Sequence, residues 1–565
     1  MNSISTYAET PVPASTKLPQ HIGENILPNF PIFSRLLYLA GNRSSLAIND
    51  VTYGHQATYG QLLSDVLHLR NAIFHRLDAD TQAKLLRGDR VCINLLAPGG
   101  YEFATAFLAT VALGAVLVPI STAVPLEEAL YFANTCQSVA LLCSSKYAEF
   151  GQRLAQTIHT TRDPSFVSLS IRPEICKKLI PHDRIVVSSD HYLDYNGDGL
   201  AIFTSGTSGP PKCAVKRRSF IDMNAKAIAD WYGLKEDDVV LHTLPVHHAT
   251  GIGITFMPFL LAGATIEFQS SGFNAAEIWD RWRKGGLTVF SGVPTMYMRL
   301  MRHFEEVLSK GPQARSYVQA ASAFRLMMCG TSALPFSLQM KWSKLLNGKR
   351  ILERYGATEF SSVFSVRPGD SENPDGSVGK VFFGLEVKLS NGDEGEILVK
   401  SPHMFTEYMY DSEATAAAFT PNGFYRTGDI ARKEGDYYFI LGRASIDIIK
   451  SGGYKISALD IEREILNMPY ISEVMVVGAE DEEFGQRVAA AIVLRDGVPP
   501  LTLEKLRMDL RERLAGYKMP TILRVVSELP KSSTGKVVKR LLKKELFPTG
   551  GHPGIQTWAF RRSKV

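Results

Sequence analysis

Short apolar runs alternate with longer stretches of helical period over most of the chain. Runs rich in aliphatic and β-branched side chains, as in buried strands, lie at residues 90–95, 140–143 and 287–290. Strands that alternate with helices in this way are typical of α/β domains with largely parallel sheets. The pattern therefore predicts an α/β fold for most of the chain.

One uncharged run, residues 103–120, has nearly the length of a membrane-spanning helix. Gly114 interrupts it, and the β-branched residues that follow lead into Pro119, which does not continue a helix. We therefore expect a buried helix that ends near Gly114 and a buried strand that ends at Pro119, and no transmembrane segment.

The pattern changes from about Gly376. Short strands separated by glycine turns, which indicate a smaller β-rich subdomain, are predicted at 378–389, 395–400 and 437–441. After Gly442 a compact α+β unit is predicted, with helices near 458–467 and 503–514 and strands at 474–477 and 488–494. We expect a body over residues 30–441, a small domain over 442–546 and a tail over 547–565.

Composition adds several exclusions. The 565 residues include 62 Lys+Arg and 57 Asp+Glu, a net charge of +5, which is ordinary for a globular protein. That length allows about three or four domains or subdomains. The basic clusters at 216–218, 539–544 and 561–562 are short, so we expect solvated faces or helix ends and no nucleic-acid partner. The 6 cysteines form no C-x-x-C pair, which favours reduced thiols over a metal site or a disulfide framework.

The chain ends bear on location. The first residues are polar and lack both the apolar run of a signal peptide and the arginines of a mitochondrial presequence. A cytoplasmic location is predicted. A peroxisomal one stays open, because the final Ser563-Lys564-Val565 resembles the Ser-Lys-Leu address. The sequence carries no signal for an oligomeric state.

The segment 201–212, A-I-F-T-S-G-T-S-G-P-P-K, is the most informative for chemistry. An apolar strand end runs into a loop of small and hydroxylated residues, which are Thr204, Ser205, Gly206, Thr207, Ser208 and Gly209. Glycines let the backbone expose N–H groups and hydroxyls add donors, so such a loop suits phosphate oxygens. The G-x-x-x-x-G-K-[ST] pattern of a P-loop is absent. Taken alone, a Ser/Thr/Gly loop is more often an ordinary loop than a phosphate site.

This segment resembles the phosphate-loop signature of the acyl-adenylating (AMP-binding) superfamily, which includes acyl-CoA synthetases, adenylation domains of peptide synthetases and luciferases. Four more segments resemble the motifs of that family in its order, at 353–359, 425–429, 442–453 and 530–536. The resemblance covers about residues 59–546. It implies a large body of two α/β subdomains and a β-rich subdomain, followed by a small mobile α+β domain.

The resemblance implies a reaction in two steps. A carboxylate attacks the α-phosphorus of ATP, and a thiol, usually coenzyme A, then attacks the acyl carbon and releases AMP. Lys536 would contact the carboxylate and the α-phosphate, Thr358 would bond the α-phosphate, and Glu359 would bind Mg²⁺ through oxygen. ATP contacts are further implied for the loop 204–209, Lys212, Tyr355, Gly356, Asp429, which would hold the ribose, and Arg443.

The second step needs a different site around the same acyl group. In the family the small domain rotates about a hinge, which corresponds to Ser445. The rotation removes Lys536 and brings in the loop that would pass coenzyme A, with Lys450, Gly452 and Gly453.

The segments 241–251, 293–297, 353–356 and 453–459 resemble the malonyl-CoA synthetase branch, which handles a small dicarboxylate. An unpaired buried charge is very costly, so the second carboxylate needs a cation, and arginine suits it. Substrate roles are implied for His247, Arg299, Thr331 and Arg354. Ala357 and Cys213 depart from the branch pattern. The departures leave open a substituted malonate, a longer acid, or an aryl or fatty acid, and a carrier protein as the acceptor.

Overall fold

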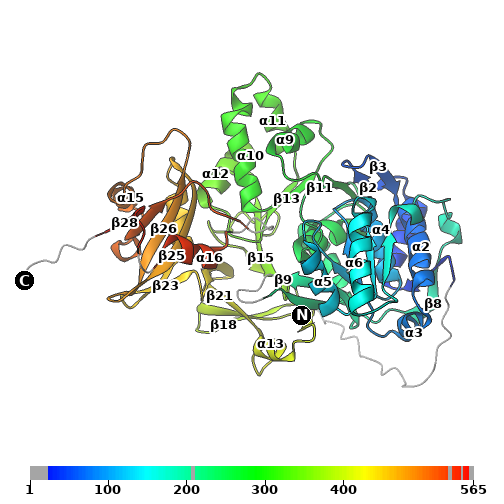
Figure 1. The fold of residues 1–565 in the computed structure, drawn as a ribbon. Coiled ribbons are helices and arrows are strands. Elements are labelled where there is room, and N and C mark those ends of the chain that lie inside the picture. The colour runs from blue at the N-terminus through cyan, green and yellow to red at the C-terminus, as the bar shows by residue number, and fades with distance from the viewer. Residues whose placement is uncertain (1–22, 205–209, 532–536, 549–550, 559–565) are drawn as a thin grey trace, which may run out of the picture.

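The computed structural model describes residues 23–204, 210–531, 537–548 and 551–558 (Figure 1). A large body occupies the right and centre of the view, and a small domain lies at the left (Figure 1). No helix of these described residues is long and apolar enough to cross a membrane.

The first α/β subdomain is built on a seven-stranded sheet with the order β20-β10-β9-β5-β4-β6-β7. Its strands are β4 Cys92–Leu96, β5 Val116–Pro119, β6 Ala140–Cys143, β7 Val167–Ser170, β9 Asp198–Thr204, β10 Lys212–Arg217 and β20 Phe405–Tyr408. Strands β4 to β7 and β9 are parallel, whereas β10 is antiparallel to both of its neighbours. Its crossover helices are α4 Tyr101–Ala112, α5 Leu126–Thr135 and α6 Ala148–Thr161.

The uncharged run 103–120 forms a helix and a strand of this subdomain, as predicted. Helix α4 ends at Ala112, Gly114 turns the chain with φ +75, and β5 ends at Pro119. The run is buried throughout because α4 packs beneath β5 and against α2 Tyr59–Arg76.

The second α/β subdomain holds a nine-stranded sheet with the order β17-β16-β15-β14-β13-β11-β12-β2-β3. Its strands are β2 Leu46–Asp50, β3 His55–Thr58, β11 Val239–His242, β12 Thr265–Phe268, β13 Val289–Gly292, β14 Leu326–Cys329, β15 Leu352–Ala357, β16 Ser361–Ser365 and β17 Lys380–Val381. Its helices are α1 Pro31–Asn42, α2, α3 Ala79–Arg87, α7 Met223–Tyr232, α8 Met257–Ala262, α9 Ala275–Arg283, α10 Pro294–Glu306, α11 Ala314–Ser322 and α12 Phe336–Leu345. Strands β1 Ile26–Asn29 and β8 Val186–Tyr192 form a separate parallel pair.

Each parallel sheet has one topological switch point. In the first sheet, β5 and β6 lie on opposite sides of β4, and in the second, β12 and β13 lie on opposite sides of β11. Connections that leave neighbouring strands in opposite directions open a crevice at the carboxyl edge of the sheet, where ligands bind in such folds. The second switch point, between β11 and β13, adjoins residues that the sequence singled out.

The β-rich subdomain is an antiparallel sheet of β18 Glu386–Leu389, β19 Glu394–Lys400, β21 Tyr425–Glu434 and β22 Tyr437–Arg443, next to α13 Ser412–Ala417. A single strand over 378–389 was wrong. The chain breaks after Val381 because Phe382 packs against Trp231 with ring centroids 4.5 Å apart. Gly384 then takes φ +70 and turns the chain into β18.

The small domain contains a six-stranded sheet of β23 Ile448–Ser451, β24 Tyr454–Ser457, β25 Ile471–Asp481, β26 Gly485–Leu494, β27 Ile522–Val525 and β28 Ile555–Thr557. Its helices are α14 Ala458–Leu466, α15 Leu503–Leu510 and α16 Lys539–Leu546. Strand β28 pairs with β27, and Trp558 packs on the domain core. The small domain therefore extends past the boundary expected at Leu546.

The basic cluster 216–218 does not lie on a solvated face, contrary to expectation. Lys216 is 0% exposed and Arg218 is 6% exposed. Strand β10 is an inner strand between β9 and β20, and successive side chains over 213–216 are all buried, so both faces of the sheet are covered there. Arg218 donates hydrogen bonds to the carbonyl oxygens of Gly114 and Asp194.

Candidate active site

The predicted phosphate loop connects two paired strands of the first sheet. Thr204, at the end of β9, pairs with Lys212, at the start of β10, and its Oγ1 donates to the Lys212 carbonyl at 3.3 Å. The Lys212 ammonium lies 5.1 Å from the centre of the Tyr408 ring and 3.8 Å from Asp411 Oδ2. Residues 205–209 fall outside the described residues, so their phosphate contacts stay a prediction.

Glu359 lies at the same corner of the body. Its Oε1 accepts a hydrogen bond from the Tyr408 hydroxyl at 3.0 Å, and its carbonyl accepts one from the Phe405 N–H at 2.6 Å. The Tyr408 hydroxyl also lies 3.2 Å from that of Tyr425. Because β20 pairs with β10, these contacts bring the Glu359 carboxylate to the strand that follows the phosphate loop.

This corner fits a magnesium nucleotide. No group of three or more His, Cys, Asp or Glu that could hold a metal occurs among the described residues. Mg²⁺ is usually held by one or two carboxylates together with substrate phosphates rather than by an all-protein cage. Glu359 supplies one such carboxylate beside the predicted phosphate loop, and the ion would neutralise charge on the phosphate oxygens.

The predicted ribose residues converge from three strands. The Tyr355 hydroxyl donates to Asp429 Oδ2 at 2.7 Å, and Arg443 Nε donates to Asp429 Oδ1 at 2.9 Å. Asp429 and Arg443 are register partners in β21 and β22. Burial, reinforced by the Asp429 carboxylate, raises the pKa of Tyr355, so its hydroxyl remains a donor. Each carboxylate oxygen keeps lone pairs for a further donor such as a sugar hydroxyl.

Gly356 lies near the end of β15, and Thr358 lies in the turn between β15 and β16. A Cβ at Gly356 would lie 2.2 Å from the Ser361 carbonyl oxygen, so only glycine fits there. The Thr358 carbonyl accepts a hydrogen bond from the buried Lys216. The two positions keep this turn close to the strand β10.

Arg354 lies at the carboxyl edge of the second sheet and is 7% exposed. Its Nη2 contacts Ser291 Oγ on β13 at 3.4 Å, whereas its buried Nη1 has no hydrogen-bond partner among the described residues. Adjacent strand residues point to opposite faces, so Glu353 does not neutralise it. Glu353 instead accepts the Leu334 N–H at 3.2 Å, and burial raises its pKa to about 7.

Two further polar groups on this edge are unpaired. Thr331 follows β14 with φ +73, and its Oγ1 has no hydrogen-bond partner within the described ranges. His247 follows β11, and its buried Nε2 likewise finds none there. Burial, with a smaller effect of His248, lowers the pKa of His247 to about 3, so the ring is neutral at ordinary pH. The carboxyl edge of the sheet thus carries two neutral polar side chains and one buried guanidinium.

Arg299 does not join that cluster in the structure. Its side chain is exposed on α10, whereas neighbouring Leu300 is fully buried. Its substrate role stays a prediction.

The predicted hinge and coenzyme A loop belong to the small domain. Ser445 is exposed, and Asp447, two residues on, accepts hydrogen bonds from the Arg443 N–H at 3.0 Å and from Lys539 at 2.6 Å. Lys450 lies on β23, and Gly452 and Gly453 turn into β24 with φ +54 and +84. Lys536 falls outside the described residues.

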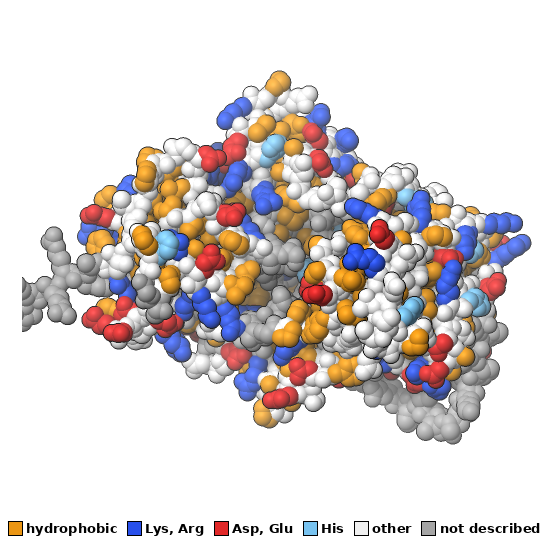
Figure 2. Space-filling model, viewed as in Figure 1, with side chains coloured by type: hydrophobic (Ala, Val, Ile, Leu, Met, Phe, Trp, Pro, Cys, Tyr) orange, Lys and Arg blue, Asp and Glu red, His pale blue; other side chains and the backbone are white. Residues whose placement is uncertain are grey.

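The body and the small domain contact each other at two places. Arg302 of α10 donates to Ser472 Oγ of β25 at 2.5 Å. Arg463 of α14 lies against Gly376, where an added Cβ would be 3.3 Å from its Nη1. A hollow with Lys and Arg side chains at its rim lies between the small domain and the body (Figure 2).

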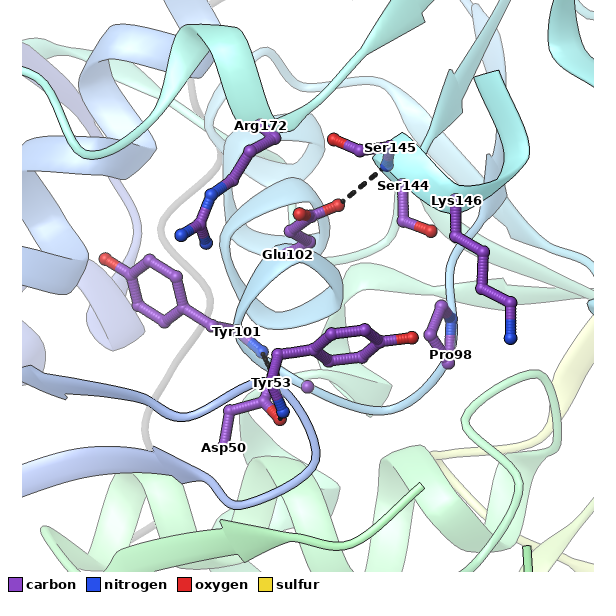
Figure 3. A pocket seen from close by; sticks show the side chains of 10 residues that line it. Asp50, Tyr53, Pro98, Tyr101, Glu102, Ser144, Ser145, Lys146 and Arg172 are labelled. Carbon is purple, nitrogen blue, oxygen red and sulfur yellow. Dashed lines mark hydrogen bonds between the residues drawn. The ribbon is translucent and has the colours of Figure 1, made fainter. Parts of the chain in front are cut away.

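A second concavity, of about 220 Å³, lies at the switch point of the first sheet (Figure 3). The residues that follow β4 and β6 line it together with Asp50, Tyr53 and Arg172. The Ser145 N–H donates to Glu102 across it at 3.2 Å. None of the residues predicted for the reaction lines this pocket, so it is separate from the site at β11–β15.

Sequence reasoning missed three residues at the site. Tyr408 bonds the Glu359 carboxylate, Ser291 bonds Arg354, and Lys216 bonds the Thr358 carbonyl. Each lies far along the chain from its partner, and no motif or spacing in a single sequence connects them. For Lys216 the sequence pointed the other way, because this residue begins the basic run 216–218, which predicted a solvated face.

Two family models match the chain. One, described as AMP-binding enzyme, matches residues 40–409, and one, described as AMP-binding enzyme C-terminal domain, matches residues 460–536.

Curated relatives are similar over most of their length. The chain is 36% identical over 490 residues to a probable CoA ligase of Humulus lupulus, covering 80% of this chain and 79% of that one. It is 34% identical over 531 residues to a malonate–CoA ligase of Arabidopsis thaliana, covering 87% and 85%. It is 32% identical over 576 residues to a mitochondrial malonate–CoA ligase of Mus musculus, covering 94% of each.

Solved structures agree with the fold. ATP-bound MatB from Rhodopseudomonas palustris superposes with a TM-score of 0.78 at 26% identity, covering 93% of this chain and 99% of that one. A malonyl-CoA ligase ternary product complex with methylmalonyl-CoA and AMP superposes with a TM-score of 0.59 at 28% identity, covering 88% and 99%.

Proposed function

This chain belongs to the AMP-binding enzyme family, and from that premise we propose that it joins malonate, or a closely related small dicarboxylate, to coenzyme A. It is an AMP-forming acyl-CoA synthetase, with ATP and coenzyme A as co-substrates and Mg²⁺ expected at the nucleotide. The proposal concerns the identity of the acid and the residues that act on it.

One observation carries the choice of acid. Arg354 is a buried guanidinium at the carboxyl edge of the second sheet, and its Nη1 has no partner among the described residues. A buried cation without a partner is strongly destabilising, and a carboxylate of the substrate would satisfy it with charge-assisted hydrogen bonds. A monocarboxylic acid would place an alkyl group there and leave the cation unpaired.

The residues of the site take distinct roles in the first step. Asp429, oriented by Tyr355 and Arg443, accepts the ribose hydroxyls. Glu359 would hold Mg²⁺, which would neutralise charge on the phosphates, and Thr358 would bond the α-phosphate. The reacting carboxylate forms a bond to the α-phosphorus as the bond to pyrophosphate breaks, and Lys536 stabilises the charge that develops.

The second step uses the other arrangement of the small domain. A thiolate of coenzyme A attacks the acyl carbon, and AMP leaves. Rotation about Ser445 would exchange Lys536 for the turn at Gly452 and Gly453. The structure superposes on the ATP-bound relative with a TM-score of 0.78 and on the product complex with a TM-score of 0.59. The better agreement with the ATP-bound relative supports assigning this arrangement of the two domains to the first step.

A direct assay tests this function. Purified protein is mixed with ATP, Mg²⁺, coenzyme A and one acid at a time, and the rate of AMP formation is measured. The acids are malonate, methylmalonate, succinate, acetate, butyrate and benzoate. We expect the highest kcat/KM for malonate or methylmalonate. The Lys536→Ala variant should lose pyrophosphate exchange but should still form the thioester from supplied acyl-adenylate.

Two outcomes would contradict the proposal in different ways. A monocarboxylate preferred over every dicarboxylate would reject the assigned acid and leave the ligase reaction standing. AMP released only when a carrier protein is added would reject free coenzyme A as the acceptor.

A further inference from the structure

Lys216 is a buried lysine that the reaction, as proposed above, does not use. It lies on β10, four residues after Lys212, and its side chain is 0% exposed. Its ammonium sits 4.5 Å from the centre of the Phe220 ring. Removing an ammonium from water costs several kcal/mol unless its hydrogens are satisfied, so its partners explain why it is tolerated.

Three neutral oxygens surround the ammonium. Nζ donates to the Thr358 carbonyl, to Ser361 Oγ and to the His403 carbonyl, each at 2.9 Å. A lysine ammonium has three donors, and here all three are used. Burial lowers the pKa of Lys216 to about 7, and the nearby negative charge of Glu359 opposes that shift. The three contacts join β10 to the turn after β15 and to the loop before β20.

Those two segments carry the metal and phosphate corner. Thr358 and Glu359 lie in the turn, and Ser361, at its end, has φ +63, which only a held backbone keeps at a residue other than glycine. From the other side, Phe405 and Tyr408 of β20 bond Glu359. Lys216 thus holds the turn and the approach to β20 together at one point, where Ser361 Oγ also donates to the His403 carbonyl at 3.2 Å.

We propose that Lys216 is a positioning residue for nucleotide activation, which holds the turn so that Glu359 meets the metal of MgATP and Thr358 meets the α-phosphate. This role deepens the proposed function and rests on it. Lys216 itself touches neither the acid nor the nucleotide. Groups behind a metal ligand orient it, and their loss commonly weakens metal affinity or activity about 10- to 100-fold.

The main variant is Lys216→Met, which keeps the length of the chain and removes all three donors. We expect the Mg²⁺ concentration for half-maximal pyrophosphate exchange to rise about 10- to 100-fold. Thioester formation from supplied acyl-adenylate should stay unchanged, because that step needs no metal-bound triphosphate. Calorimetry of ATP binding with and without Mg²⁺ gives a second readout, and Mg²⁺ should enhance ATP affinity less in the variant.

Arg218→Met is the matched control. It removes another buried cation just after the same strand, but Arg218 bonds the carbonyls of Gly114 and Asp194, away from the nucleotide corner. We expect it to lower the midpoint of thermal unfolding and to leave the Mg²⁺ dependence as in the wild type. A purely structural role for Lys216 would make the two variants behave alike.

Ser361→Ala keeps the test decisive if Lys216→Met does not fold. It removes one of the three acceptors and should raise the Mg²⁺ requirement in the same direction by a smaller factor. Wild-type Mg²⁺ dependence in every folded variant of Lys216 and Ser361 would overturn the assignment, as would an equal change in Arg218→Met. If the wild type forms AMP with none of the acids tested, the proposed function fails. The calorimetry of ATP binding with and without Mg²⁺ then still decides the role of Lys216.

Discussion

Three buried cations of the body differ in how they are satisfied. Arg218 donates to backbone carbonyls, and Lys216 has an acceptor for each of its three donors. The Arg354 side chain bonds Ser291 Oγ at a long 3.4 Å, and its Nη1 finds no partner in the described part of the chain. Since proteins rarely leave a buried charged donor unsatisfied, we propose that the second carboxylate of the substrate is the missing partner of Nη1.

Arg354→Met tests that reading. Leaving a buried carboxylate without its partner costs about 3–5 kcal/mol, so the malonate KM should rise by about two to four orders of magnitude. The KM for acetate or butyrate should change little, because neither carries a second charge. Steady-state kinetics with both acids provide the measurement.

The control for Arg354 is Arg350→Met. Arg350 lies nearby in a partly exposed ion pair with Asp375 at 2.8 Å, which contributes little to stability or binding. The role of Arg354 in binding the second carboxylate would be rejected by either of two results. One is an equal rise in KM for malonate and the monocarboxylates in Arg354→Met, and the other is a similar rise in the malonate KM in Arg350→Met.

At the scale of elements, the turn of the β23–β24 hairpin exposes its backbone, because its two residues are glycines. Gly452 and Gly453 both take the left-handed conformation, and no heavy atom lies within 4 Å of a Cβ added at Gly453. Tyr454 of this hairpin stacks on Tyr517 with ring centroids 4.3 Å apart, which braces it against the domain. A turn that is open and rigid suits the close passage of a pantetheine arm.

Gly453→Ala should slow the second step selectively. A left-handed conformation costs a residue with a Cβ about 1–2 kcal/mol, which corresponds to about a fivefold to thirtyfold slower thioester formation if the turn must keep its shape. Pyrophosphate exchange should be unchanged. The rates of the two half-reactions, measured separately, give the comparison.

Gly497→Ala is the companion variant, because Gly497 has φ +76 and equally open space but lies in the turn before α15. It should leave both half-reactions at the wild-type rate. Slowing of pyrophosphate exchange by Gly453→Ala would place the hairpin in the first step instead.

At the scale of the whole molecule, the contact between Arg302 and Ser472 marks one arrangement of body and small domain. If the domain must rotate between steps, fixing this contact should permit only the first. We therefore expect Arg302→Cys with Ser472→Cys, joined by a reducible bismaleimide, to keep pyrophosphate exchange and to lose acyl-CoA formation. Reduction of the linker should restore it.

All forms in that experiment carry Cys176→Ser, since Cys176 is the exposed cysteine of the chain. Each single cysteine variant treated with the reagent controls for modification alone. Full acyl-CoA formation by the cross-linked protein would show that the two steps do not require the domain to move away from α10.

The sequence alone determined the kinds of element and their order. Hydrophobic period and turn residues act over a few positions, so α4, β5 and β6 were predicted closely, as was the helix α14. The five motifs predicted the family and its nucleotide residues, and the match of family models to residues 40–409 and 460–536 confirmed the family.

Only the tertiary structure decided what depends on distant packing. It buried Lys216 inside β10, left Arg299 exposed, and joined Tyr355 to Asp429 across 74 residues of chain. It also drew Ile555–Thr557 into the sheet of the small domain. Whether a polar side chain is solvated or paired depends on segments distant in sequence that pack against it, and the local sequence does not specify those segments.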